Sequence, residues 1–218
     1  MYVVEVRREK MKRNLMILII ITLPIFLFTQ TPNWQWVSQA GGDGWDSNPS
    51  IAIDDFGNSY VVGNFAETAT FGNHTVTSSE GSDIFIAKMS TNGNWQWVQS
   101  VSGSNWEASK AITIDDNGNT YVTGVFEETM IFGEVSITSN GNEDIFVAKL
   151  DTNCNWQWVS QAGGSSLDQV STMAIDANGN NYLAGYFVET TTFGNYTFTS
   201  NGSSDGFVVK VDEYGNWL

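Results

Sequence analysis

After residue 33 the apolar positions alternate with polar ones at a period of two, which indicates half-buried strands. Residues 50–54 form one such run, residues 55–58 have the composition of a tight turn, and residues 60–63 run back. A second predicted hairpin joins residues 83–89 to residues 95–98. Sustained helical periodicity is absent from every window after residue 28. The pattern predicts an all-β chain.

The same pattern recurs every 61 residues without an insertion or a deletion. Asn-Trp-Gln-Trp-Val occupies residues 33–37, 94–98 and 155–159, and Asn216-Trp217 begins a fourth copy. A strict long period indicates that each unit is one module that buries its core against the next. We therefore predict one repeat domain over residues 33–218, with units at residues 33–93, 94–154 and 155–215 and a fourth starting at residue 216.

Two hairpins in series make a four-stranded antiparallel sheet in each unit, the construction of a β-propeller blade. The predicted fold is three blades that form a partial propeller. A β-solenoid-like repeat array is the alternative, although solenoid coils usually have shorter periods. Three blades are few, because propellers typically have four to eight. We expect either two chains to combine into a six-bladed ring or further blades to come from a longer chain.

The residues that repeat carry a recognisable motif. In the second and third units it runs Asp144-Ile145-Phe146-Val147-Ala148-Lys149, then Trp156-Gln157-Trp158 and Gly163-Gly164, and it closes over residues 174–185. This motif resembles the bacterial β-propeller repeat family named for seven-bladed propellers, the SBBP repeats, over essentially everything after residue 33. The resemblance implies a non-enzymatic propeller of the kind found in large secreted or cell-surface proteins.

Residues 1–32 read as an N-terminal extension with a signal peptide. Lys12 and Arg13 precede the largely apolar residues 15–28, a pattern typical of export signals and short for a membrane span. Met11 is a better start for such a signal than Met1. We expect cleavage between residues 28 and 33 and a secreted or cell-surface protein of a bacterium. Because residues 28–31 lack a small-x-small site, an uncleaved membrane anchor is the alternative.

The charge distribution narrows the possible partners. The formal net charge is −15, and five of the nine Lys and Arg residues lie within the first thirteen positions. From residue 31 onward four lysines stand against 22 acidic residues. Such a surface repels nucleic acid, so a nucleic-acid partner is excluded.

Few residues suit catalysis or metal binding. The one cysteine, Cys154, stands where the other units have glycine in a turn, and the one histidine, His74, has no counterpart in the other units. Residues 115–119 are similar to part of a calcium loop, but the closing bidentate glutamate of an EF-hand is missing. We interpret Asp54, Asp115 and Asp176 as turn residues. No cofactor is predicted, with structural calcium as the alternative.

The tryptophans are the strongest candidates for ligand contact. The paired tryptophans of each unit are two residues apart, so we expect each pair to project from one face of its strand and to pack between blades. The pairs are Trp34 and Trp36, Trp95 and Trp97, and Trp156 and Trp158. Trp45 and Trp106 lie in Gly- and Ser-rich loops, with Leu167 at the third position, and are the predicted ligand-binding residues.

Two further sets of charged residues recur. Asp83 and Lys88, with their copies in the other units, are predicted to face opposite sides of a strand and to form ion pairs between blades. Glutamate recurs at residues 67, 128 and 189, but symmetric copies on separate blades do not provide the two differing carboxylates of a glycosidase.

These observations favour a binding or scaffolding module for protein interaction or adhesion, without catalysis and with an unknown protein or glycan as partner. A carbohydrate-binding propeller that uses the loop tryptophans is the alternative. An extracellular hydrolase is the third hypothesis.

Overall fold

A computed structural model describes residues 33–218, apart from the side chains of residues 48, 49 and 80. The chain divides into two units, Met1–Gln35 and Trp36–Leu218, and the fold described below is that of the second. The predicted signal peptide, its cleavage site and Met11 lie outside the described residues.

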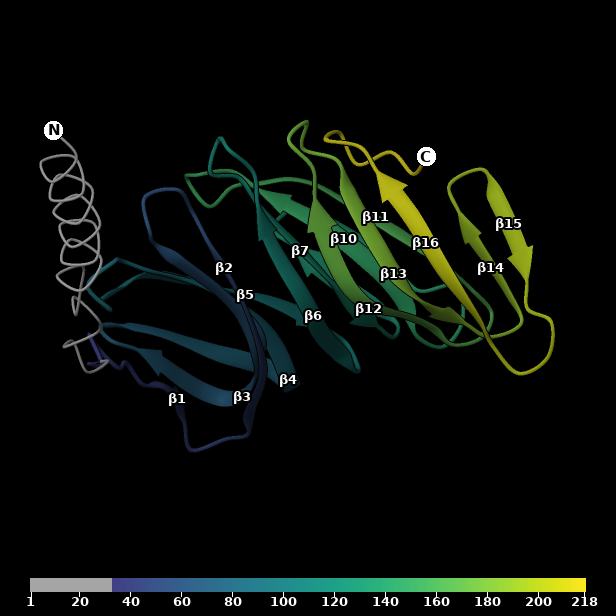
Figure 1. Ribbon diagram of the computed structural model, residues 1–218. Coiled ribbons are helices and arrows are strands. Elements are labelled where there is room, and N and C mark those ends of the chain that lie inside the picture. The colour runs from purple at the N-terminus through teal and green to yellow at the C-terminus, as the bar shows by residue number, and fades with distance from the viewer. Residues whose placement is uncertain (1–32) are drawn as a thin grey trace, which may run out of the picture. The chain divides into compact units, whose positions relative to one another are not determined.

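Residues 33–218 form sixteen strands and no helix (Figure 1). The first five are β1 (Ala40–Gly42), β2 (Asp46–Ile53), β3 (Ser59–Phe71), β4 (His74–Met89) and β5 (Trp95–Gly103). The next six are β6 (Glu107–Ile114), β7 (Thr120–Phe126), β8 (Thr129–Phe132), β9 (Val135–Thr138), β10 (Asp144–Leu150) and β11 (Trp156–Gly164). The last five are β12 (Asp168–Ile175), β13 (Asn181–Phe187), β14 (Thr190–Phe193), β15 (Tyr196–Thr199) and β16 (Asp205–Val211).

Each complete blade takes three strands from one repeat and its outer strand from the start of the next repeat, and the two predicted hairpins are confirmed. In the second blade the strands pair antiparallel in the order β6, β7, β10, β11. The first blade has the same order, β2, β3, β4, β5. The third blade consists of β12, β13 and β16, and a single bridge between Val211 and Trp217 begins its fourth strand.

A small third hairpin in each repeat was not predicted from the sequence. It consists of β8 and β9 in the second repeat and of β14 and β15 in the third. In the first repeat its strands are continuous with β3 and β4, which explains their length. The end of β5 pairs with β8, and the end of β11 pairs with β14, so each outer strand leaves its own blade and joins the hairpin of the next.

A recurring glutamate marks where this hairpin departs from the blade. Glu67, Glu128 and Glu189 have φ between 57° and 62°, in the left-handed region that side-chain-bearing residues rarely adopt. The backbone N–H of each donates to a serine hydroxyl eleven residues later, at distances of 2.8 to 3.0 Å. The repeated glutamates therefore belong to a bend in the chain.

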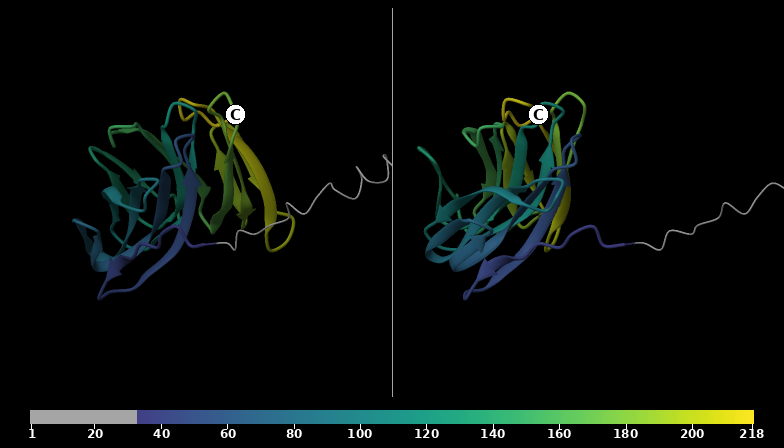
Figure 2. Two further views of the ribbon diagram at one scale, coloured as in Figure 1. Left: turned by 60° about the vertical axis from the view of Figure 1, so that its left-hand side comes forward. Right: turned by 90° about the vertical axis from the view of Figure 1, so that its left-hand side faces the viewer.

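The blades pack face to face in sequence order, and the innermost strand β6 of the second blade contacts both β2 of the first and β12 of the third (Figure 2). One apolar cluster, which includes Ile86, Ile112 and Phe132, lies between the first and second blades. A second cluster, which includes Val147, Met173 and Leu183, lies between the second and third. Each module thus buries its core against the next, as the strict period predicted.

This arrangement is a β-propeller-like repeat fold, all-β and open in the described residues. Every strand pairing between residues 33 and 218 is antiparallel, which fits four-stranded blades. The coils of a β-solenoid would instead stack in parallel.

Cys154 lies at a turn position where the other repeats have glycine. Cys154 has φ of 66°, and Gly93 and Gly215 at the equivalent positions have φ of 78° and 90°. Cys154 is half-buried rather than exposed, and burial raises the pKa of its thiol. The cysteine therefore occupies a turn position that favours glycine.

Candidate functional site

The two ends of each blade differ in character. The turns between β6 and β7 and between β10 and β11 lie at one end, which we call the turn end. The loops before β2, β6 and β12 lie at the other end, which we call the loop end (Figure 1). The loop end carries Trp45, Trp106 and Leu167.

The structure places these three residues at equivalent points. The backbone carbonyls of Trp45, Trp106 and Leu167 accept hydrogen bonds of 2.8 to 2.9 Å from Ala66, Glu127 and Val188. The backbone of each loop is therefore fixed against the bend described above. The side chains of Trp45 and Trp106 are 60% and 41% exposed. The exposed part of each ring is accessible to a ligand.

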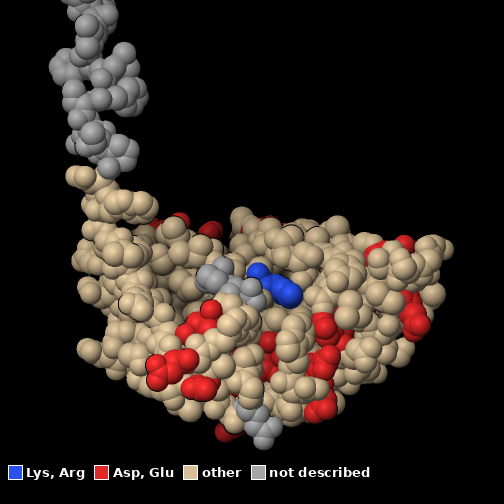
Figure 3. All heavy atoms as spheres, turned by 90° about the horizontal axis from the view of Figure 1, so that it is seen from below, with Lys and Arg blue, Asp and Glu red and all other residues tan. Residues whose placement is uncertain are grey.

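Acidic side chains lie close to the loop that carries Trp106. The Asn105 side chain donates to the Glu127 carboxylate at 2.9 Å, and the Ser104 hydroxyl donates to the Glu128 carboxylate at 3.3 Å. Burial, together with the charge of Glu127, raises the pKa of Glu143. On the face shown in Figure 3 acidic side chains are spread widely and basic ones are confined to one spot. The loop end therefore presents aromatic rings in a negative field.

Behind this surface a pair of carboxyl groups is buried at each blade interface. Asp83 of the first blade faces Glu107 of the second, and Asp144 of the second lies close to Asp168 of the third. All four side chains are almost completely buried. No donor from elsewhere in the described residues reaches either oxygen of Glu107 or one oxygen each of Asp144 and Asp168.

Burial raises the pKa values of these groups. The pKa of Glu107 rises to about 8, because burial disfavours its charge and the Asp83 carboxylate repels it. The pKa of Asp144 rises to about 6, mainly through burial, with a further contribution from the charge of Asp168. Burial and the neighbouring Asp83 carboxylate both favour the protonated form of Glu107. The sequence signal was available, because carboxylates recur at residues 46, 107 and 168 and at residues 83, 144 and 205.

The tryptophan pairs do not project from one face, contrary to the sequence prediction. A β-bulge between Lys88 and Met89 places an extra residue between Trp95 and Trp97, and the same bulge occurs beside Trp156 and Trp158. Trp156 packs on Phe132 in the cluster between the first two blades, whereas Trp158 packs in the cluster between the second and third. Trp156 and Trp158 therefore pack on opposite faces of their blade, and Trp95 and Trp97 do the same. The expected packing role fits these two pairs but not the first, in which Trp34 is 97% exposed and Trp36 is 40% exposed.

The predicted ion pair between Asp83 and lysine of another blade is also wrong. Lys88 lies 3.9 Å from Asp54 of its own blade, and its ammonium group lies 4.7 Å from the centre of the Tyr60 ring. Lys149 and Lys210 lie over Tyr121 and Tyr182 in the same way. These lysines stabilise the turn end within each blade, and Asp83 faces a carboxyl group instead.

The aspartates once compared with a calcium loop hold their own turns. The Asp115 carboxylate accepts from the backbone N–H groups of Asn117 and Asn119 and from the Asn119 side chain. Asp54 and Asp176 make the same bonds, and these bonds lower the pKa of Asp176. Within residues 33–218 no group of three or more His, Cys, Asp or Glu side chains is arranged to hold a metal ion.

We predict that a calcium chelator leaves the melting temperature unchanged, because the turn carboxylates are already satisfied by hydrogen bonds. Ligands that bind only the folded state raise its stability, so a structural ion would be revealed by its removal. Thermal unfolding of the dialysed protein with and without chelator checks this. A large fall in melting temperature that added calcium reverses would contradict it.

Comparison with known proteins gives one informative similarity. The chain is 26% identical to an uncharacterized WD repeat-containing protein of Acanthamoeba polyphaga mimivirus, over 60% of this chain. The match spans 11% of the length of the viral protein. No protein-family model matches the chain. WD repeats fold as four-stranded propeller blades, in agreement with the blades described here. Across the described residues, no helix is long and apolar enough to cross a membrane.

Proposed function

We propose that this chain is a non-catalytic interaction module that binds a protein partner at the loop end of its blades. The observation that carries the proposal is the exposure of Trp45 and Trp106 at equivalent positions of neighbouring repeats. Exposed aromatic residues are enriched in protein interfaces and contribute much of their binding energy. Because acidic residues lie beside the Trp106 loop, and 22 acidic residues stand against four lysines from residue 31 onward, the partner surface is expected to be basic.

Burial of the perturbed carboxyl groups supports a role without catalysis. A glycosidase needs two carboxyl groups with different pKa values in one accessible pocket. Asp83 and Glu107 are each 1% exposed, so a substrate does not reach them. The similarity to a WD repeat-containing protein and the resemblance to SBBP repeats also favour a scaffold. Export to the cell surface remains part of the proposal, based on residues 12–28, and the intact mass of the exported protein tests it.

A peptide library displayed on phage tests the proposed binding. We expect selected peptides to be rich in Lys and Arg, and their affinity to fall at least tenfold in the variant Trp106→Ala. Tyr214→Ala is the matched control, because Tyr214 is exposed at the turn end. Equal losses in both variants, or no selected peptide, would contradict the proposal.

A glycan array run in parallel addresses carbohydrate binding, which the same two rings favour because aromatic faces stack on sugars. Saturable glycan binding that Trp106→Ala abolishes would favour this second function over the first.

A further inference from the structure

The outer strands of the first two blades share one recurring contact. In both blades the second tryptophan of the outer strand packs on a tyrosine of the same blade. The ring centres are 6.1 Å apart for Tyr60 and Trp97, and 6.0 Å apart for Tyr121 and Trp158. The Trp158 indole N–H also donates to the carbonyl of Glu213 in the next blade, at 3.0 Å. Each outer strand thus joins two consecutive blades.

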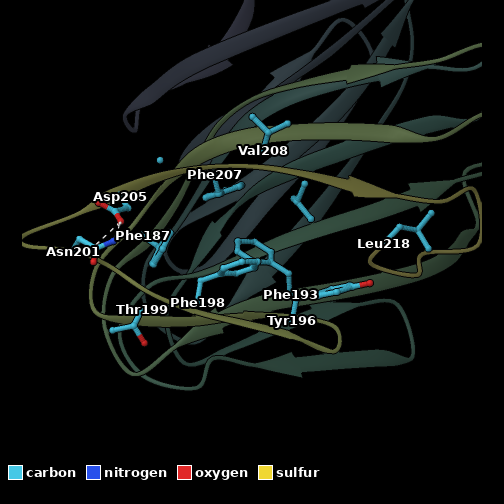
Figure 4. A pocket seen from close by; sticks show the side chains of 12 residues that line it. Phe187, Phe193, Tyr196, Phe198, Thr199, Asn201, Asp205, Phe207, Val208 and Leu218 are labelled. Carbon is cyan, nitrogen blue, oxygen red and sulfur yellow. Dashed lines mark hydrogen bonds between the residues drawn. The ribbon is translucent and has the colours of Figure 1, made fainter.

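In the described residues the third blade contains the tyrosine of this contact without the tryptophan. Lys210 lies 5.6 Å from the centre of the Tyr182 ring, but no tryptophan of the described residues packs on Tyr182, which is 40% exposed. Along the outer edge of β16, the one strand pairing among the described residues is the bridge between Val211 and Trp217. Val208 on that strand is 78% exposed, whereas Ile86 and Val147 at equivalent positions are completely buried. A cavity of about 610 Å³ lies here, lined by Phe193, Phe198, Phe207 and Val208 among others (Figure 4).

The segment that starts at Trp36 contains the other half of this contact, the tryptophan. Trp36 donates its indole N–H to the Thr91 carbonyl at 2.9 Å and lies against Gly93, as Trp158 does with Glu213 and Gly215. Trp36 has therefore already joined the next blade, but among the described residues no tyrosine covers its other face. Ile51 on β2 is 60% exposed, whereas Ile112 at the equivalent position is 4% exposed. Inside the chain Ile112 packs in one cluster with Ile86.

We propose that a second copy of this chain binds here, with residues 36–40 of each copy forming the outer strand of the partner's third blade. The internal pairings fix the register: Ile86 lies opposite Gln99, and Val147 lies opposite Ser160. Shifted by one repeat, this places Ser38 of one copy opposite Val208 of the other. Trp36 then covers Tyr182, and Ile51 packs on Val208. Two such contacts, related by a two-fold axis, close a ring of six blades, a number typical of propellers.

A designed disulfide tests this register. In a Cys154→Gly background, the double variant Ser38→Cys, Val208→Cys is expected to form a covalent dimer on mild oxidation. A mixture of the two single-cysteine variants is expected to do the same. The matched control within one chain is Val147→Cys, Ser160→Cys, which should cross-link without a change in mass. Val37→Cys, Val208→Cys shifts the register by one residue, places the thiols on opposite faces and should cross-link poorly.

Three results would overturn the proposal. One is no dimer from the double variant while the control within the chain forms its disulfide. Another is an equally strong dimer from Ser38→Cys alone, because this would indicate a head-to-head contact in which residue 38 of one copy lies beside residue 38 of the other. The third is equal cross-linking in both registers. Each readout is independent of the loop-end tryptophans, so failure here leaves the proposed function to be judged by its own experiment.

Discussion

Raising the pH from 5 to 8 is expected to destabilise this protein. The reason is the buried pair of Asp83 and Glu107. Burial and the charge of Asp83 raise the pKa of Glu107 from its ordinary value near 4.5 to about 8. Between these two values the folded protein holds a proton that the unfolded chain has released. The contribution of this group is therefore complete below pH 4.5 and is lost as the pH rises towards 8.

For such a group the free energy of unfolding falls by about 1.4 kcal/mol per pH unit across this window. Asp144, whose pKa is raised to about 6, adds to the slope at its lower end. Urea unfolding at several pH values measures the effect. The variant Glu107→Gln keeps the shape of the side chain without its charge, so we expect a smaller slope and a gain in stability at pH 8.

Glu134→Gln is the matched control, because Glu134 is exposed, and it should retain the slope of the unmodified protein. A stability that increases from pH 5 to pH 8 would contradict the raised pKa of Glu107. A loss of stability in Glu107→Gln at every pH would do the same, because it would indicate a pair that is stable when ionised.

The variant Gly124→Ala is expected to lower the free energy of unfolding by about 3 kcal/mol, near the upper end of the range for overpacked cores. Gly124 lies in the centre of the second blade, opposite Phe146 of β10. An added Cβ would lie 2.7 Å from the Phe146 ring and would clash with the carbonyl oxygen of Ala108 on β6. The backbone cannot retreat without breaking the pairing of β7 with its neighbours. Gly63 and Gly185 lie beneath Phe85 and Phe207 in the same way.

Gly206→Ala is the matched control. The nearest atom to an added Cβ there is the Gly185 carbonyl oxygen at 3.6 Å, and the equivalent residues are Ile84 and Ile145. We expect no loss of stability in this variant, and thermal unfolding of both proteins gives the comparison. For a domain of this size the expected loss in Gly124→Ala lowers the melting temperature by roughly 10 °C. Similar melting temperatures for the two variants would contradict the packing described for the blades.

The features that the sequence revealed are those encoded by neighbouring residues. The hairpin over residues 50–63 was predictable, because alternating apolar residues flank a turn whose Asn and Gly residues are local signals. The small hairpin was missed because only its second strand alternates apolar and polar residues, as in Val135–Thr138, whereas its first strand, Thr129–Phe132, does not. Its signal was the Phe-Gly step that recurs at residues 71, 132 and 193, where the glycines have φ near 60°.

Features that depend on two blades meeting were not predictable in the same way. The period placed carboxylates at fixed positions but did not show that Asp83 meets Glu107 of the next blade. The bulge at Gln96 places Trp97 on the face opposite to that of Trp95. The two-residue spacing of the tryptophans in the sequence does not indicate this bulge. Trp45 and Trp106 were located correctly in exposed loops, because Gly and Ser in the flanking sequence mark loops directly. Their role in ligand binding remains a prediction.

The proposed dimer requires that the two end faces of the three blades are complementary. Sedimentation equilibrium of the full chain at micromolar concentration tests it most directly, with the variant Val208→Asp measured beside it. We expect twice the mass of the chain for the unmodified protein and the mass of one chain for Val208→Asp, because the variant places a charge in the apolar contact. An unmodified chain that sediments as a monomer and unfolds cooperatively would contradict the claim, and so would an association that Val208→Asp leaves unchanged.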